Sequence, residues 1–308
     1  MSITCGSQMV AGLTVPRIPL VLIEGGTYQL GRCSSIALST FRMAITPTTN
    51  AQYSSVVQQL GTARYFMETT DPVNGRSFVV ARGDDPEEIR NADELEVQGW
   101  FREAGYPDLA DDHDGRGALN VISVGEFDPK TGFDTRGQPA VEVTWYGALI
   151  FAEMMRLVTG NDYALPTEYQ WGWAAKDGNA GLGYATDTGQ LSPKSAHYDH
   201  DYPEEADPNV PAITTVHVYD PRYPEMGNGL RHMTGNVWEW TSTWDGKLPK
   251  GLLEDPVGPK AGSWKSHCGG SWREFMSDSL NSSALHHALQ TYSSSDLGFR
   301  LVINGGGV

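Results

Sequence analysis

Residues 268–302 read CGGSWREFMSDSLNSSALHHALQTYSSSDLGFRLV. The two ends of this stretch are typical of structured chain, because paired glycines permit a close backbone approach and Trp272, Phe299 and Leu301 favour burial. Between the ends, Ser, His, Asn, Leu, Thr and Tyr follow neither the helical nor the strand period. We therefore predict a core anchor at each end with an exposed run between them. We also expect Arg300 to be a buried cation paired with a carboxylate.

The chain has 308 residues, with 22 Lys+Arg against 38 Asp+Glu and a formal net charge of −16. Such a charge repels phosphate backbones and argues against a nucleic-acid partner, although an acidic surface can also reflect only solubility or a salty habitat. The first residues lack the basic and apolar regions of a signal peptide, and no run of 18 apolar residues is present. We expect a monomer without a membrane span, made in the cytoplasm. Association with a virion or another particle stays open.

Hydrophobic periodicity predicts two main helices. The first runs from Trp145 to Val158, because its apolar residues share one face, and it ends at Gly160. The second follows Thr167, a favourable N-cap residue, with Glu168 in its first turn near the positive end of the helix dipole. These helices sit among many short apolar segments, which favours an α+β fold rich in loops.

A third helix is expected after Thr48 or Thr49, with inward side chains at helical spacing: Tyr53, Val56, Val57 and Leu60. The predicted strands are two short segments within 18–31 around the Gly25-Gly26 turn, then 36–45, 237–244, 262–272 and a final strand at 297–303.

The pattern predicts one α+β domain over residues 18–308, preceded by an N-terminal extension at 1–17. An acidic, turn-rich insertion at about 70–137 interrupts the domain, and we expect it to be mostly loop with a short helix near 86–96.

Four phrases in fixed order carry a family resemblance. They are LIEGGTYQLG (22–31) with TNAQY (49–53), VEVTWYGALIFAEMM…ALPTEYQWGWAA (141–175), GLRHMTGNVWEW (229–240) and GGSW…LGFR (269–300). Together they resemble the formylglycine-generating-enzyme (sulfatase-modifying factor) domain family. The resemblance covers about residues 18–304 outside the insertion, and it implies that family's elaborated C-type-lectin-like fold.

One branch of this family oxidises a sulfatase cysteine with copper, which two thiolates hold because Cu(I) prefers soft ligands. Counted from the GGS phrase, the resemblance places those two positions at Glu274 and Ser279. Neither side chain is a thiolate, and Cys268 has no second cysteine within the segment. We therefore expect no enzyme activity of this kind, while an oxidoreductase of the same family with another metal, or an accessory protein, remains the alternative.

A second branch resembles the iron-dependent sulfoxide synthases, which add an N-terminal four-helix domain that carries a histidine cluster. Here the family phrases begin by residue 18, which leaves no room for that domain. His286 and His287 are adjacent, and neighbouring side chains point in different directions on a strand or a helix. His197 and His200 form no recognised metal motif. We expect no iron site.

A third branch does no chemistry: the variable proteins of diversity-generating retroelements, which resemble this chain most. In that branch, errors in copying template adenines turn AAC codons into any NNC codon between GGSW and GFR. Between Trp272 and Gly298, only Glu274, Met276 and Gln290 fall outside the residues that NNC encodes. We therefore predict a C-terminal variable segment at about 272–300.

This variable segment would bind an unknown protein or glycan, since exposed aromatics with small hydroxyl neighbours suit recognition. The alternative is a polar loop with no partner. The predicted ligand-binding residues are Arg273, Phe275, Asp278, Ser279, Leu285, His287, Leu289, Thr291, Tyr292, Ser294, Ser295 and Asp296.

The family resemblance also implies a structural calcium ion beside the GNVWEW phrase, although no cofactor is required for recognition. Its ligands would be the carbonyls of Gly235 and Val237 and the carboxylate of Glu239. His232 stands where a side-chain oxygen is expected, which weakens the site because calcium prefers hard oxygen ligands. The alternative is that Glu239 pairs with an arginine and Asn236 forms a turn.

Overall fold

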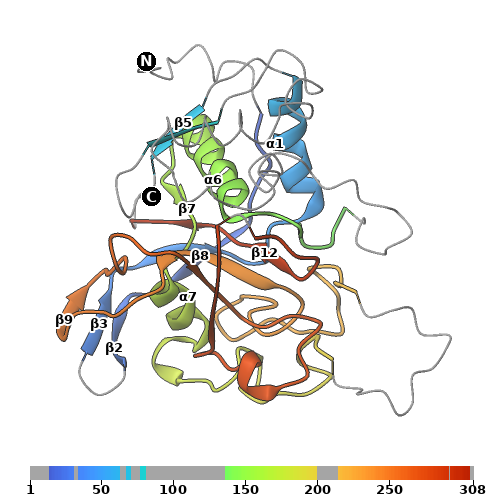
Figure 1. The fold of residues 1–308 in the computed structure, drawn as a ribbon. Helices are drawn as coiled ribbons and strands as arrows, with labels where there is room; N and C mark the ends of the chain where they lie inside the picture. Colours follow the sequence, from blue (N-terminus) through green and yellow to red (C-terminus); the bar gives the residue numbers. More distant parts are fainter. Residues whose placement is uncertain are drawn as a thin grey trace.

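The computed structural model describes residues 14–30, 34–62, 67–70, 77–80, 136–199, 214–290 and 292–305 (Figure 1). Its helices are α1 (Asn50–Thr62), α6 (Trp145–Thr159) and α7 (Glu168–Ala175), with short 3₁₀ helices η1 (Gly178–Ala180) and η2 (Ser277–Leu280). The described residues contain no helix with the length and apolar character needed to cross a membrane.

Local capping explains where the helices begin. The Thr49 hydroxyl accepts from the Gln52 amide, and the Gln52 side chain accepts from the Thr49 amide in return. Thr167 and Gln170 form the same reciprocal pair at the start of α7. Thr144 caps α6, and Gly160 ends it with a left-handed φ of 71°. The three helices predicted outside the insertion are confirmed, and Thr49 rather than Thr48 is the first cap.

The central sheet has the strand order β11-β10-β8-β12. Its strands are Leu285–Ala288, Lys265–Cys268, Trp238–Trp244 and Leu297–Phe299, in that order. Strand β8 pairs antiparallel with β10 and parallel with β12. Both ends of the variable segment therefore lie next to the same buried strand.

A second sheet has the order β1-β4-β13-β7, with strands Leu20–Ile23, Phe41–Ala44, Val302–Ile303 and Tyr163–Ala164. A third has the order β2-β3-β9, with strands Gly26–Leu30, Ser34–Leu38 and Gly251–Glu254. Strands β5 (Met67–Thr70) and β6 (Ser77–Val80) pair antiparallel.

Two of the predicted strands are wrong as single units. The stretch 36–45 divides into β3 and β4, and the stretch 297–303 divides into β12 and β13, which belong to different sheets. The two segments around Gly25 are also in different sheets, although both exist. A Cβ on Gly25 would lie 2.3 Å from the Leu38 carbonyl oxygen, so the chain passes between the sheets only with glycine there.

The insertion predicted at about 70–137 begins with strands, since β6 and part of β5 fall at its start. The expected helix near 86–96 lies outside the described residues. The side chains of Val57 and Leu60 lie outside them too, whereas Tyr53 and Val56 are buried as predicted.

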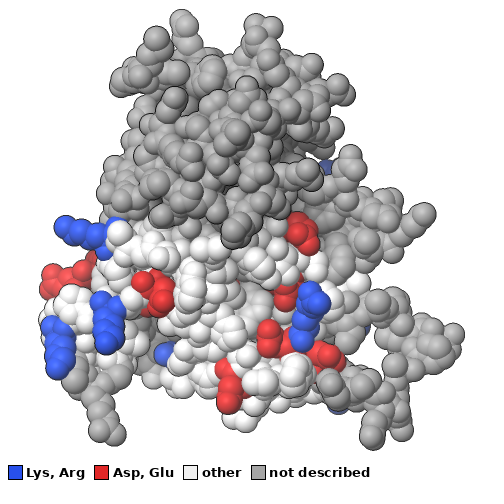
Figure 2. Space-filling model, in the orientation of Figure 1, with Lys and Arg blue, Asp and Glu red and all other residues white. Residues whose placement is uncertain are grey.

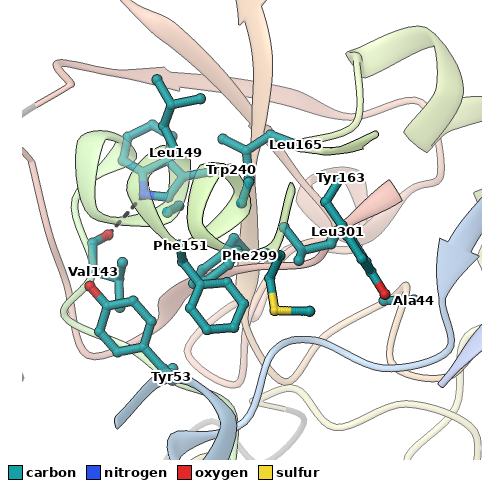
Figure 3. Packing of buried hydrophobic residues seen from close by; sticks show 14 of the residues in the cluster. Ala44, Tyr53, Val143, Leu149, Phe151, Tyr163, Leu165, Trp240, Phe299 and Leu301 are labelled. Atoms are coloured by element: carbon teal, nitrogen blue, oxygen red, sulfur yellow. Dashed lines mark hydrogen bonds between the residues drawn. The ribbon is translucent and has the colours of Figure 1, made fainter. Parts of the chain in front are cut away.

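Hydrophobic clusters cover both faces of the central sheet, with α6 on one side of β8 and α7 on the other (Figure 1). Figure 3 shows the rings of Tyr53, Phe151 and Phe299 packed together on the α6 side, with the Trp240 indole donating to the Val143 carbonyl at 2.9 Å. Tyr53 lies 5.8 Å from Phe151 and 5.9 Å from Phe299, between ring centroids. The Phe299 end of the variable segment is therefore fixed in the core.

Candidate functional site

Arg300 holds the C-terminal end of the variable segment. Its guanidinium donates to both carboxylate oxygens of Glu239, at 2.6 Å and 2.7 Å, and to backbone carbonyls of Ala44 and Arg231 at 3.0 Å and 2.8 Å. Glu239 also accepts from the Trp171 indole at 2.8 Å. The side chains of Arg300, Glu239 and Trp171 are buried, so these hydrogen bonds compensate for the loss of solvation. The expected buried arginine is confirmed, and its carboxylate partner is Glu239.

Two glycines hold the N-terminal end of the variable segment. Gly269 and Gly270 have φ values of 103° and 72°, in the left-handed region that favours glycine. A Cβ on Gly270 would lie 2.6 Å from the Leu280 side chain, so η2 packs directly against this turn. The close approach inferred from the paired glycines is therefore present.

The backbone joins the two ends of the segment to β8 and to Asn236 just before it. The Trp272 amide donates to the Asn236 carbonyl at 3.0 Å, and the Trp238 amide donates to the Asp296 carbonyl at 2.8 Å. The Trp272 indole is only half-buried, so the expectation that it belongs to the core is corrected. Its N–H reaches the Ser295 carbonyl at 3.4 Å and links the two ends of the segment.

Most of the predicted binding residues at the middle of the segment are exposed. Phe275 is 59% exposed, Leu285 40%, Leu289 48% and Tyr292 50%, which is unusual for apolar side chains of this size. The other exposed members of the predicted set are Arg273, Asp278 and His287, and Thr291 lies outside the described residues.

The remaining predicted residues are not on an open surface. Ser279 is 8% exposed because the turn of η2 directs Ser279 and Leu280 inward, so the expectation of an exposed Ser279 is corrected. Ser294, Ser295 and Asp296 are half-buried. The Asp296 carboxylate accepts from the Ser271 hydroxyl at 2.9 Å and from Ser294, and its main role here is to close the segment.

Sequence reasoning missed two exposed apolar residues, Met276 and Trp264, each about half exposed. Trp264 lies just before β10, outside the variable segment. Its neighbour Ser263 is linked to the segment, because the Gln290 side chain donates to the Ser263 carbonyl at 3.1 Å. Met276 follows Phe275 and is one of the three residues between Trp272 and Gly298 that NNC codons do not encode. Figure 2 shows that the described surface on one face of the molecule is mostly uncharged, with scattered acidic and basic side chains, several of them next to one another.

Two histidine rings contact the buried Trp238, His286 in a tilted arrangement and His267 edge-on. The exposed His286 ring lies 4.5 Å from the Trp238 ring, and the His267 ring lies 5.0 Å from it, between centroids. Burial lowers the pKa of His267 to about 3, with further lowering by His286 and His287. His287 points elsewhere, with its Nδ1 3.6 Å from a carboxylate oxygen of Asp245. The different directions expected for His286 and His287 are confirmed.

The residues proposed for calcium do not fit that ion in this structure. Both oxygens of Glu239 accept hydrogen bonds from Arg300, so calcium would have to displace a buried guanidinium. The Gly235 carbonyl accepts from the Val237 amide at 2.9 Å, and Asn236 forms a turn with a φ of 66°. Calcium requires six to eight oxygen ligands, whereas the Gly235 carbonyl and both Glu239 oxygens already accept hydrogen bonds. The alternative expectation, that Glu239 pairs with an arginine, is confirmed.

The two positions of the copper thiolates carry other functions here. The Glu274 carboxylate accepts from the Trp238 indole at 3.2 Å, and Ser279 packs inward. The Cys268 thiol is buried and its pKa is raised, first by burial and then by Glu168 and Glu239. No group of three or more His, Cys, Asp or Glu side chains suited to a metal occurs among the residues that the structure describes.

Comparison with known proteins defines the class. A family model for the sulfatase-modifying factor enzyme 1-like domain matches residues 13–305, and the chain belongs to this family. Among curated proteins, a serine/threonine-protein kinase pkn1 of Chlamydia pneumoniae is 31% identical over 170 residues, 54% of this chain and 24% of the kinase. A formylglycine-generating enzyme of Streptomyces coelicolor is 31% identical over 140 residues, 44% of this chain and 42% of the enzyme. The chain thus spans less than half of either relative.

Solved structures share the fold at low identity. Treponema denticola variable protein 1 superposes with a TM-score of 0.57 at 18% identity, over 93% of this chain and 95% of that one. PvdO from Pseudomonas aeruginosa gives a TM-score of 0.58 at 16% identity, over 92% and 93% of the two chains. The resemblance to both the formylglycine-generating family and a variable protein is therefore confirmed, and the fold is α+β with mixed sheets.

Proposed function

We propose that this chain is a recognition protein without catalytic activity, a variable protein of a diversity-generating retroelement that presents residues 272–300 on a C-type-lectin-like scaffold. The observation that carries the proposal is the contrast between the ends of the segment and its middle. Phe299, Arg300 and Leu301 are completely buried, whereas Phe275, Leu289 and Tyr292 are about half exposed.

This contrast suits a surface that changes in sequence without unfolding its support. Substitutions at half-exposed positions on a surface cost little stability, whereas substitutions in the buried ends leave cavities or unpaired charges. The likeness to Treponema denticola variable protein 1 supports the same interpretation at the level of the fold.

Sequencing the gene and its surroundings tests the proposal. We expect a reverse-transcriptase gene nearby, a near-copy of the codons for residues 272–300 rich in AAC, and natural isolates that differ at those codons. Isolates that differ evenly along the chain, with no second copy of the segment, would contradict it. If a second copy of the segment exists but has no adenines at the positions that correspond to the codons for Phe275 and Tyr292, those two residues are not diversified.

The second candidate is a metal-dependent oxidoreductase or an accessory protein of the formylglycine-generating family. The relatives named formylglycine-generating enzyme favour it. Glu274 and Ser279 weigh against the copper chemistry, because neither supplies a soft thiolate ligand. Oxygen uptake measured with copper or iron and a cysteine-containing peptide distinguishes the two candidates: uptake above the metal-only rate supports the enzyme.

A further inference from the structure

We propose that strand β11, inside the variable segment, binds its partner by edge-to-edge pairing with an extended, basic peptide. This inference rests on the function proposed above and names the class of partner, a linear peptide strand rather than a glycan.

The first observation is the position of β11 at the edge of the sheet. Residues Leu285–Ala288 pair with β10 along their whole length, and the sheet order ends at β11 within the described part of the chain. In an antiparallel pair, successive residues direct their N–H and C=O groups alternately toward the partner strand and away from it. Half of these backbone groups in β11 therefore point outward, and an extended peptide can bind them.

The second observation is the set of side chains along this edge. Leu285, His286 and His287 are exposed, and Leu289 and Tyr292 follow directly. An added strand would contact alternate side chains of β11 and these neighbours. Continuity with the exposed part of the variable segment places the edge inside the proposed recognition surface.

The third observation is charge. Asp245 lies beside β11, with its side chain 44% exposed and one oxygen 3.6 Å from His287 Nδ1. Lys265 of β10 is opposite Ala288 in the register and is buried. Its ammonium donates to the Ser242 carbonyl at 2.8 Å and lies 3.8 Å from the centroid of the Trp244 ring. The cation of β10 is thus directed inward while a carboxylate faces solvent. With a formal net charge of −16, the chain attracts a peptide that carries Lys or Arg.

Main-chain pairing has a particular advantage in a segment that varies. Backbone groups persist whatever residue a codon specifies, with proline as the exception, so affinity from the edge survives diversification. The changing side chains then determine which peptide fits. A glycan offers no row of alternating N–H and C=O groups and would not use this edge.

The experiment uses the full chain with two probes, a library of linear nonapeptides and a glycan array. We expect selected peptides to contain Lys or Arg and to be extended. Methylating the peptide amides one at a time should weaken binding about tenfold or more at every second residue and little at the residues between, since one or two hydrogen bonds are lost. Equal effects at all positions, or none, would overturn the proposal.

Two proline variants provide the test from the protein side, His286→Pro and His287→Pro, each with an alanine control at the same position. One N–H faces β10 and the other faces outward, so one variant should lower the Tm and the other should not. The variant with an unchanged Tm should bind the peptide about tenfold more weakly than its own alanine control, which also lacks the imidazole but keeps the backbone N–H. Equal binding by the proline variant and its alanine control overturns the proposal.

The outcomes separate the two proposals. A glycan bound through Phe275 and Tyr292, with no linear peptide retained, overturns edge pairing and leaves the proposed function intact. Absence of any retained peptide overturns edge pairing as well. The proposed function fails independently, through the gene sequences described above.

Discussion

Arg300 and Glu239, 61 residues apart in the sequence, form a buried ion pair with two hydrogen bonds, and their side chains are 0% and 1% exposed. The pair connects the C-terminal end of the variable segment to the start of β8. Because the guanidinium also donates to carbonyls of Ala44 and Arg231, it joins the central sheet to β4 and to the loop before β8.

Replacing Glu239 with alanine should destabilise the chain by about 3–5 kcal/mol, since it leaves a buried guanidinium without its carboxylate. Urea unfolding followed by tryptophan fluorescence measures the change in the free energy of unfolding. The matched control is Glu153→Ala, which removes a partly exposed pair with Arg156 and should cost about 1 kcal/mol or less. Equal losses in the two variants would contradict the structural role of Glu239.

The triple replacement of Phe275, His287 and Tyr292 with alanine should leave the Tm almost unchanged and abolish ligand binding. These side chains are exposed, so little buried apolar surface is lost. Phe299→Ala serves as the comparison, since a buried phenylalanine costs about 3–5 kcal/mol. If the triple variant melts as early as Phe299→Ala, these residues belong to the core and the surface assignment fails.

The chain should not bind Cu(I) tightly, whereas the double variant Glu274→Cys with Ser279→Cys should. Both proteins are prepared with Cys5 and Cys33 replaced by serine, so that only the segment is tested. The expected difference follows from the preference of Cu(I) for thiolates. Competition with a coloured Cu(I) chelator measures it. Tight binding without the two added cysteines would favour the oxidoreductase candidate.

Stability should fall as the pH is lowered from about 6.5 toward 3, partly through His267. Burial lowers its pKa in the folded chain from 6.5 to about 3, so the unfolded chain binds more protons in this window. The contribution is complete above pH 6.5 and is lost progressively below it. His267→Gln should reduce the slope of unfolding free energy against pH by at most about 1.4 kcal/mol per unit between pH 4 and 6. Carboxylates titrate in the wild type and in the variant alike, so their contribution cancels when the two slopes are subtracted. Identical slopes in the two proteins would contradict a neutral, buried His267.

The sequence predicted the helices and the two ends of the variable segment well, because caps and apolar faces are local signals. It also indicated a buried Arg300. It did not name the carboxylate partner of Arg300. That pairing depends on the strand register, in which Gly298 of β12 lies opposite Glu239 of β8. Register between distant strands leaves no local pattern.

Strands β9 and β11 were missed for a related reason. Each lies at the edge of its sheet and exposes most of its side chains, so neither shows the alternation of buried and exposed residues that marks a half-buried strand. The division of 297–303 into β12 and β13 was missed too, since Arg300 and Leu301 lie between two strands that continue one apolar run. Ser279 was misplaced because the inward turn of η2 is set by its contact with Gly270.

The central sheet brings Cys268 opposite Glu239 and Leu297 opposite Trp238, so that the chain at the two ends of the variable segment faces adjacent positions of one strand. The interior of the segment is attached as well, since the Ser282 amide donates to the Gly183 carbonyl at 2.9 Å and the Trp145 amide donates to the Gln290 carbonyl at 3.1 Å. Exchange of the segment between related proteins therefore has to preserve these internal contacts together with the two attachment points on β8. Engineering of this fold is best confined to the exposed positions between them.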